Sequence, residues 1–463
     1  MERVFEYIDQ NRDRFVQELL PLVAQPSVSA TGEGVEDFAK MMVAAMAEVG
    51  FQAELLPVPG GPSCIYGEIA GSDSHRTLML ADHYDVVPPG RLEDWKNPPF
   101  EPVIRDNRIW GRGAGDCKGQ LFCYLKAIEA WHAMNGELPV RVRMVLIGDD
   151  EIGAPSVISL LKTHTERMKA DAIFWADAST LDVWGPAVIL GARGVLAIKL
   201  VARGAAYEAH SGSYGALLRN PGVRLAHAIT AMRGADGKVL VPGFYDDLKP
   251  FGEVERYLLA NLKLDKEAKL RSLGATEFWG DPGYQYFETQ QYRPTFNIHG
   301  MISGYTGDGW MAVVPAVATA KIDINLVPNL DPDDLVAKLR KHLDNCGFQD
   351  IEIQVVTKHP FYYWAQPGDP FLNLVSRALK RVWGMDPVLY PSIGGGGGGS
   401  VPSTFKELVG NENYLLVPLG QPDMNEHSPR ESLDIDWFIR GIKVMATTID
   451  EFAKSDIGRG NRP

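Results

Sequence analysis

The segment LMLADHYDVVPPG, residues 78–90, places a histidine and two aspartates directly after a short apolar run. The run predicts a buried strand, so His83 and Asp85 stand where that strand leaves the core. Polar groups at the carboxyl end of a strand are where α/β sheets usually keep their chemistry. One His-x-Asp pair decides little, and the rest of the chain has to supply its partners.

Further acids and a second histidine stand in the same kind of place, at strand ends or in loops: Asp116 in GRGAGDCKGQ, the run Asp149–Asp150–Glu151, Asp177 and His427. Taken singly, each has an ordinary structural interpretation as a helix cap, a turn residue or part of a solvated loop. Taken together, two histidines and three or more carboxylates are the ligand set of a hydrolytic metal such as zinc. Two ions about 3.5–4 Å apart can share a bridging carboxylate.

The elements that must position these residues alternate between strand and helix. Apolar runs at 77–81, 142–148 and 171–176 predict strands, and residues 121–134 predict a helix between them. Such alternation is typical of a layered α/β sheet. The fold class is therefore predicted as α/β.

From about Gly191 the pattern of predicted helices and strands changes. Residues 194–204 and 317–327 predict strands of a second domain, and residues 210–232 a loop that leads into a helix. Alternation then returns, with helices expected near 333–345, 370–383 and 434–453 and a strand at 351–356. We expect a catalytic domain formed by 1–190 and 328–463, with an inserted α+β domain at 191–327.

Composition excludes several classes of protein. The formal net charge of −13 over 463 residues argues against a nucleic-acid or anionic-membrane partner. The four cysteines form no CxxC pair, which favours a reduced, cytoplasmic location. The charged, amphipathic N-terminus does not have the pattern of a signal peptide, and no apolar stretch is long enough to span a bilayer.

A run of six glycines, 394–399, lies between a predicted strand and further apolar sequence. It is either a flexible linker or a loop that brings backbone N–H groups close to a ligand. The second interpretation makes Gly398, Gly399 and Ser400 candidate substrate-binding residues.

In this order along the chain, HYDVVP, DWKNPPFEP, GRGAGDCKGQ, DDEIGAPS, EAHSGSYG and EHSPRES resemble the di-zinc metallopeptidase family of aminoacylase, carboxypeptidase G, carnosinase-like dipeptidases and succinyl-diaminopimelate desuccinylase. VLVPGFYDD, PTFNIHG, GYTGDG and VVPAVATAKI resemble the carnosinase-like branch in particular. The resemblance covers nearly the whole chain.

The resemblance implies a role for each residue at the metal centre. His83 and Asp177 would hold one ion, Glu151 and His427 the other, and Asp116 would bridge them. Asp85 would orient His83 by accepting a hydrogen bond from its second ring nitrogen. The cofactors expected are two Zn²⁺ per subunit, with Mn²⁺ or Co²⁺ as alternatives, and the Asp116–Cys117 peptide is expected to be cis.

The resemblance also gives the inserted domain a function. His210 would stabilise the developing oxyanion across the interface of a homodimer, and Asn220 would be a second polar contributor from the same domain. The insertion would then be a lid and dimerisation domain.

Two positions depart from the family pattern. Asp150 stands where relatives have the glutamate that acts as general base, so the carboxylate is one methylene shorter and activity could fall. Asn325 stands where relatives commonly have an arginine that binds the substrate carboxylate, a task for which an amide is poorly suited. Either Arg193 or Arg293 supplies that charge, or the substrate has no free α-carboxylate there.

The function expected is hydrolysis of dipeptides or N-acyl amino acids by water activated between two metal ions, with Asp150 as base. The alternatives are a hydrolase of an unusual aryl amide and a catalytically weak member that binds a peptide-like ligand.

Overall fold

The computed structural model describes residues 1–463 apart from 249, 251, 280–284, 364, 395–400 and 460–463. Two compact units make up the chain. The first comprises 1–191, 363–391 and 396–463, and the second comprises 192–362 and 392–395. The predicted residues Gly398, Gly399 and Ser400 lie outside the described part.

An eight-stranded sheet forms the centre of the first unit, in the order β1-β2-β6-β3-β7-β18-β8-β17. Its strands are β1 Gln52–Leu56, β2 Cys64–Ile69, β3 Gly71–His83, β6 Leu138–Ile147, β7 Ala172–Trp175, β8 Ala187–Ile189, β17 Val388–Tyr390 and β18 Tyr414–Leu416. The middle strands β6, β3, β7 and β18 run parallel. Parallel strands buried on both faces read as continuous apolar runs, which is why β3, β6 and β7 could be predicted from the sequence.

The helices of this unit pack on the sheet or on one another: α1 Glu2–Gln10, α2 Arg12–Ala24, α3 Val35–Glu48, α4 Gln120–Asn135, α5 Val157–Thr163, α12 Pro370–Trp383, α13 Val401–Val409 and α14 Ile435–Lys454. α4 is buried along almost its whole length and packs against α14, which packs against α12. A three-stranded sheet, formed by β4 Val103–Arg105, β5 Arg108–Trp110 and β19 Ser432–Asp434, stands beside them. The α/β architecture predicted from the sequence is confirmed.

The second unit is built on a four-stranded antiparallel sheet in the order β12-β14-β10-β15. Its strands are β10 Gly194–Arg203, β12 Asn297–Ser303, β14 Val317–Leu326 and β15 Glu352–His359. α7 Pro221–Met232 and α11 Pro332–Asn345 supply apolar side chains to the core of this unit. α8 Glu253–Asn261, α9 Lys266–Leu273, α10 Tyr286–Tyr292 and a small ladder of β11 Ala209–His210 with β13 Val313–Val314 complete its main elements.

The boundary predicted at residue 327 is wrong, because α11 and β15 belong to the second unit. β15 pairs along β10, and Leu335, Leu339 and Leu343 of α11 are fully buried in the core of that unit. Alternation of helix and strand cannot show which sheet an element joins, so the sequence assigned this segment to the wrong unit.

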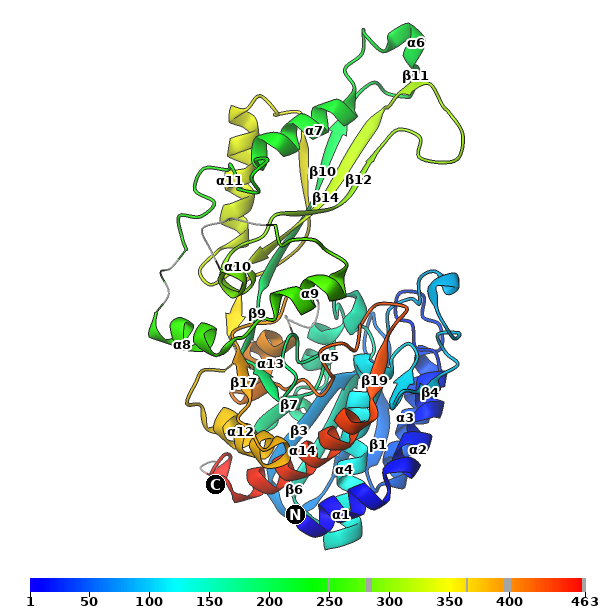
Figure 1. Ribbon diagram of the computed structural model, residues 1–463, viewed down its shortest axis with the longest axis vertical. Coiled ribbons are helices and arrows are strands. Elements are labelled where there is room, and N and C mark those ends of the chain that lie inside the picture. Colours follow the sequence, from blue (N-terminus) through cyan, green and yellow to red (C-terminus); the bar gives the residue numbers. More distant parts are fainter. Residues whose placement is uncertain (249, 251, 280–284, 364, 395–400, 460–463) are drawn as a thin grey trace. The chain divides into compact units, whose positions relative to one another are not determined.

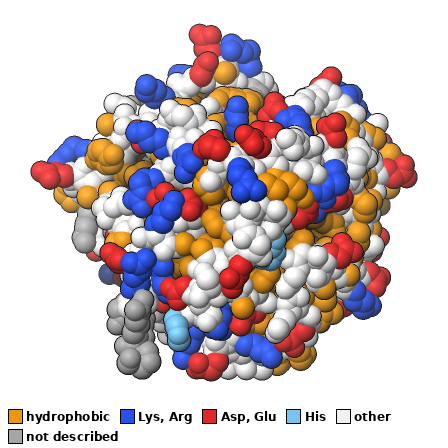
Figure 2. Space-filling model, turned by 90° about the horizontal axis from the view of Figure 1, so that it is seen from below, with side chains coloured by type: hydrophobic (Ala, Val, Ile, Leu, Met, Phe, Trp, Pro, Cys, Tyr) orange, Lys and Arg blue, Asp and Glu red, His pale blue; other side chains and the backbone are white. Residues whose placement is uncertain are grey.

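No helix in the described part of the chain is both long and apolar enough to cross a membrane. On the face shown in Figure 2, acidic and basic side chains are interspersed among apolar ones over much of the surface.

Candidate metal centre

Three strand ends bring the predicted residues together at one edge of the large sheet. His83 is the last residue of β3, Asp150 and Glu151 follow β6, and Asp177 follows β7. In the ladders His83 lies opposite Ile147, and Ala81 lies opposite Trp175. Because these strands are parallel and adjacent, the loops after them begin at the same edge of the sheet.

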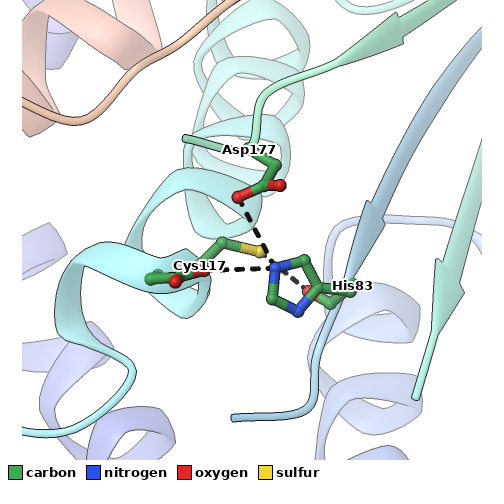
Figure 3. Close-up of side chains that lie close together, drawn as sticks. His83, Cys117 and Asp177 are labelled. Atoms are coloured by element: carbon green, nitrogen blue, oxygen red, sulfur yellow. Dashed lines mark hydrogen bonds and ion pairs between the residues drawn. The ribbon is translucent and has the colours of Figure 1, made fainter. Parts of the chain in front are cut away.

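The first ligand group contains His83, Asp116 and Asp177. The Nε2 atom of His83 lies 3.2 Å from Oδ1 of Asp116 and 3.6 Å from Oδ1 of Asp177. Figure 3 shows the imidazole of His83 facing the Asp177 carboxylate, with Cys117 beside them. The potential ligand atoms of this group, which also includes Cys117, lie within 4.8 Å of one another.

The second group contains Asp116, Glu151 and His427. The Nε2 atom of His427 lies 3.1 Å from Oδ2 of Asp116 and 3.0 Å from Oε2 of Glu151. Asp116 therefore belongs to both groups and presents one carboxylate oxygen to each histidine. All five predicted ligands meet, as the metal-site interpretation requires.

Asp116 is held in this position by its own backbone and by a buried acid. The Asp116–Cys117 peptide is cis, as expected. Glu431 accepts hydrogen bonds from the backbone N–H groups of Gly115 at 3.1 Å and Asp116 at 3.0 Å, and it also pairs with Arg112. Glu431 is fully buried.

Glu431 was not among the residues predicted from the sequence, although it lies in the segment EHSPRES. A histidine followed four residues later by an acid was the signal available. Nothing in that spacing indicates that the acid binds the backbone of a distant turn, so its positioning role depends on the tertiary structure.

Asp85 orients two parts of the centre. The Nδ1 atom of His83 lies 3.1 Å from the backbone carbonyl oxygen of Asp85 and 3.4 Å from its Oδ1. The carboxylate accepts the backbone N–H groups of Asp150 at 3.1 Å and Glu151 at 3.0 Å. The backbone carbonyl is thus the nearer partner of the histidine, and the carboxylate mainly fixes the loop after β6.

Cys117 is a weaker ligand candidate than its position suggests. Its Sγ atom lies 2.8 Å from Oδ1 of Asp82 and 2.9 Å from the backbone oxygen of His83. Burial raises the pKa of the Cys117 thiol well above its usual value, which favours the neutral form. Because the thiol is already engaged with these two oxygen atoms, the histidines and carboxylates are the better ligand candidates.

Burial and charge shift the ionisation of the centre in opposite directions. Burial raises the pKa of Asp150 well above its usual value, and burial together with Asp116 raises that of Glu151. Burial also acts on Asp116, but His427 and His83 outweigh it and hold the pKa of Asp116 below its usual range. Asp116 and Glu151 raise the pKa of His427 to about 10.

These directions describe a cluster of acids in which protonated imidazoles supply the positive charge. A divalent cation supplies the same charge and displaces those protons on binding. The donor atoms are imidazole nitrogens and carboxylate oxygens, which suit zinc and similar first-row ions. The residues therefore fit a pair of such ions.

Asp150 has an unused hydrogen-bond acceptor. Its side chain is nearly buried, and its Oδ1 atom has no hydrogen-bond partner among the described residues. A buried carboxylate oxygen without a partner is costly unless a ligand or substrate uses it.

The remaining predicted residues all lie in the second unit. His210 is exposed at the end of β11. The side chain of Asn220 caps α7 by accepting the N–H groups of Gly222 and Val223. Asn325 lies near the end of β14. Asn220 thus has a capping role in this structure, which differs from the substrate-binding role predicted from the sequence.

The chain matches the family model described as peptidase family M20/M25/M40 over residues 79–451. A Cys-Gly metallodipeptidase of Schizosaccharomyces pombe is 27% identical, covering 98% of both chains. Human beta-Ala-His dipeptidase is 27% identical over 98% of this chain and 93% of that protein.

Solved structures agree with these relatives. A metallo-carboxypeptidase of the M20 family from Sulfolobus solfataricus has a TM-score of 0.85 and 31% identity, covering 95% of this chain and 99% of its own. Human carnosine dipeptidase 1 has a TM-score of 0.86 and 26% identity, covering 98% and 99%. The resemblance seen in the sequence is confirmed, and the chain belongs to the peptidase family M20/M25/M40.

Proposed function

We propose that the protein is a metal-dependent hydrolase of dipeptides, with N-acyl amino acids as the neighbouring substrate class. The names of the relatives support this assignment, since they are dipeptidases of Cys-Gly and beta-Ala-His. The observation that carries it is the shared carboxylate of Asp116, which faces His83 with one oxygen and His427 with the other. That arrangement suits two adjacent cations.

The cations proposed are two Zn²⁺, held by His83, Asp177, Glu151 and His427 with Asp116 between them; Mn²⁺ and Co²⁺ are the alternatives. When bound, such ions polarise a carbonyl and lower the pKa of water. The nitrogen and oxygen donors of the centre support this choice.

The proton transfers are assigned to Asp150. Its carboxylate removes a proton from the attacking water and returns that proton to the leaving amine. The partner-free Oδ1 atom and the backbone hydrogen bond to Asp85 support this assignment, because they leave the acceptor free and its loop fixed.

We further propose a homodimer in which His210 serves the partner's catalytic site. Its exposure in the second unit supports this, as do exposed apolar neighbours in sequence, among which Tyr207 is 78% and Leu217 is 76% exposed. Exposed apolar side chains that gather on one segment are typical of a protein interface. The second unit is accordingly proposed as a lid and dimerisation unit, and the four free cysteines support a cytoplasmic location.

The decisive experiment is a substrate panel assayed with metal-depleted protein and after addition of Zn²⁺, Mn²⁺ or Co²⁺. Dipeptides, N-acyl amino acids and aryl amides are compared. We expect cleavage of dipeptides that is lost on depletion and restored by one of the ions. Binding of dipeptides without turnover by the reconstituted protein would instead support a catalytically weak, ligand-binding protein. Turnover of aryl amides alone would support a hydrolase of an unusual aryl amide.

A further inference from the structure

A cavity of about 770 Å³ lies within the second unit. Its described lining consists of Arg233, Gly237, Val239, Tyr245, Leu248, Trp279, Thr289, Arg293, Pro294, Thr295, Phe296, Asn297, Asp323 and Asn325. The volume is within the usual range for small-molecule sites, and the mixture of apolar walls with a few polar groups is typical of them.

Arg233 is a polar group of this lining with unused hydrogen-bonding capacity. One Nη atom donates to the backbone oxygen of Phe296 at 2.6 Å. Its Nε atom is buried and has no hydrogen-bond partner, and no carboxylate of the described residues pairs with Arg233. A buried donor without a partner is costly, so this guanidinium is prepared for an acceptor that the protein itself does not supply.

The guanidinium is held in place by an aromatic ring. Its central carbon lies 5.0 Å from the ring centre of Trp279. The same indole lies close against Gly237, where an added Cβ would meet it at 3.0 Å. A stacked guanidinium has lost much of its rotational freedom already, so a ligand that binds it pays less entropy.

The only acid in the described lining is already engaged. Oδ1 of Asp323 accepts from Asn297 at 3.0 Å and lies 2.9 Å from Nδ1 of His299. With Arg233 and Arg293 against Asp323, the described lining carries two positive charges and one negative charge. The cavity therefore favours an anion.

Asn325 and Arg193 narrow the choice of residue that binds the anion. Asn325 lines the cavity but has no charge. Arg193 is buried and donates to the backbone oxygens of Gln290 and Arg293, so it supports the segment that carries Arg293. It does not belong to the described lining.

We propose that this cavity binds the carboxylate of an amino-acid-like ligand, with the carboxylate on Arg233 and an apolar side chain against Trp279 and Tyr245. A planar guanidinium binds carboxylates with paired hydrogen bonds, and the aromatic walls suit an apolar group. The carboxylate belongs either to the terminal residue of a dipeptide substrate or to a free amino acid. The first source rests on the proposed function, and the second does not.

Direct binding tests the cavity without any catalysis. 3-Phenylpropionic acid and its primary amide, which belong to neither proposed substrate class, are titrated into the metal-loaded full chain by calorimetry. We expect the acid to bind and the amide to bind at least about tenfold more weakly. The Arg233→Gln variant should bind the acid about ten- to a hundredfold more weakly than the parent protein does. Arg203→Gln is the matched control, since Arg203 is an arginine of the same unit that is 68% exposed.

A second variant separates the site from folding. Trp279 is 60% exposed, so Trp279→Ala should leave the fold intact. It should weaken binding of the acid, because the Arg233 guanidinium is no longer held against the ring. Thermal unfolding of each variant is measured alongside. Equal binding of acid and amide, or unchanged binding of the acid by both variants, would overturn the proposal, because the probe would then sit elsewhere, for example at the metal centre.

Steady-state kinetics distinguish the two sources. If the carboxylate is that of the substrate, Arg233→Gln raises KM for a dipeptide about tenfold or more and leaves KM for the dipeptide amide unchanged. If the bound carboxylate is that of a free amino acid, Arg233→Gln leaves KM for the dipeptide unchanged, while the variant no longer binds the acid in calorimetry. Dipeptide hydrolysis by the parent protein tests the proposed function separately, so the two proposals can fail independently.

Discussion

The carboxylate of Asp85 holds the backbone of Asp150, with an oxygen 3.1 Å from its N–H group. The other oxygen takes the N–H of Glu151, so one buried side chain fixes a proposed base and a proposed ligand together. Asp85 thus acts through the backbone of these two residues, as a positioning residue.

Asp85→Asn should lower kcat about ten- to a hundredfold, the usual cost of disturbing a group that orients a metal ligand. An amide presents one oxygen and one NH2 group, so one of the two backbone N–H groups would face a donor. Bound metal and kcat are measured together, with Asp94→Asn at an exposed position as control. Unchanged kcat would show that the backbone carbonyl of Asp85 alone orients the centre.

Asp150→Ala should abolish turnover while both metal ions remain bound, because Asp150 is not among the proposed ligands. Asp150→Glu should equal or exceed the parent rate if the shorter side chain is a handicap. Metal content by elemental analysis and kcat on a dipeptide decide both points. Near-normal activity of Asp150→Ala would contradict the assigned role.

Glu431→Ala should destabilise the protein by about 3–5 kcal/mol, since it leaves Arg112 as an unpaired buried charge and removes the acceptor for Asp116. Metal affinity should fall as well, because Asp116, the proposed bridging residue, loses its support. Chemical unfolding and metal titration measure the two effects. The double variant Arg112→Met/Glu431→Met removes the unpaired charge and should recover part of the stability but not of the metal affinity.

Glu129 on α4 should contribute to the pH dependence of stability. Burial raises its pKa, but Arg14 at 2.5 Å and Lys126 at 2.7 Å outweigh burial and hold it below the usual value. A carboxylate whose pKa is lower in the folded protein than in the unfolded chain stabilises the folded protein at pH values above its ordinary pKa. This contribution is lost as the pH falls through the pKa that the group has in the folded protein.

Glu129→Gln should therefore lower the free energy of unfolding by about 1 kcal/mol at pH 7. The difference from the parent should shrink as pH falls below about 4.3, the ordinary pKa of glutamate. Urea unfolding at several pH values from about 3 to about 7 measures this difference. Glu166→Gln, at a side chain that is 82% exposed, is the control and should show no such trend.

Mixing His210→Ala chains with Asp150→Ala chains should restore activity if His210 acts in the partner's site. After random exchange about half of the dimers are mixed, and one of the two sites in each is intact, so about a quarter of parental activity is expected. No recovery, with exchange proven by mass spectrometry, would show that His210 serves its own chain or takes no part.

The sequence by itself determined the local elements and the residue types of the centre. Apolar runs predicted β3, β6 and β7, and a histidine or an acid after each marked the edge where chemistry could occur. These features depend on short-range patterns, in which burial on both faces of a strand leaves a continuous apolar run. Such patterns can be recognised in the sequence without knowledge of the tertiary structure.

Only the tertiary structure decided which groups meet and how they are held. Asp116 and Glu431 are more than 300 residues apart, yet their contact fixes the proposed bridging carboxylate. The assignment of β15 to the second sheet and the unsatisfied Nε atom of Arg233 likewise result from long-range packing. Periodicity reports which face of an element is buried, but the partner that buries it is chosen by the folding of the whole chain.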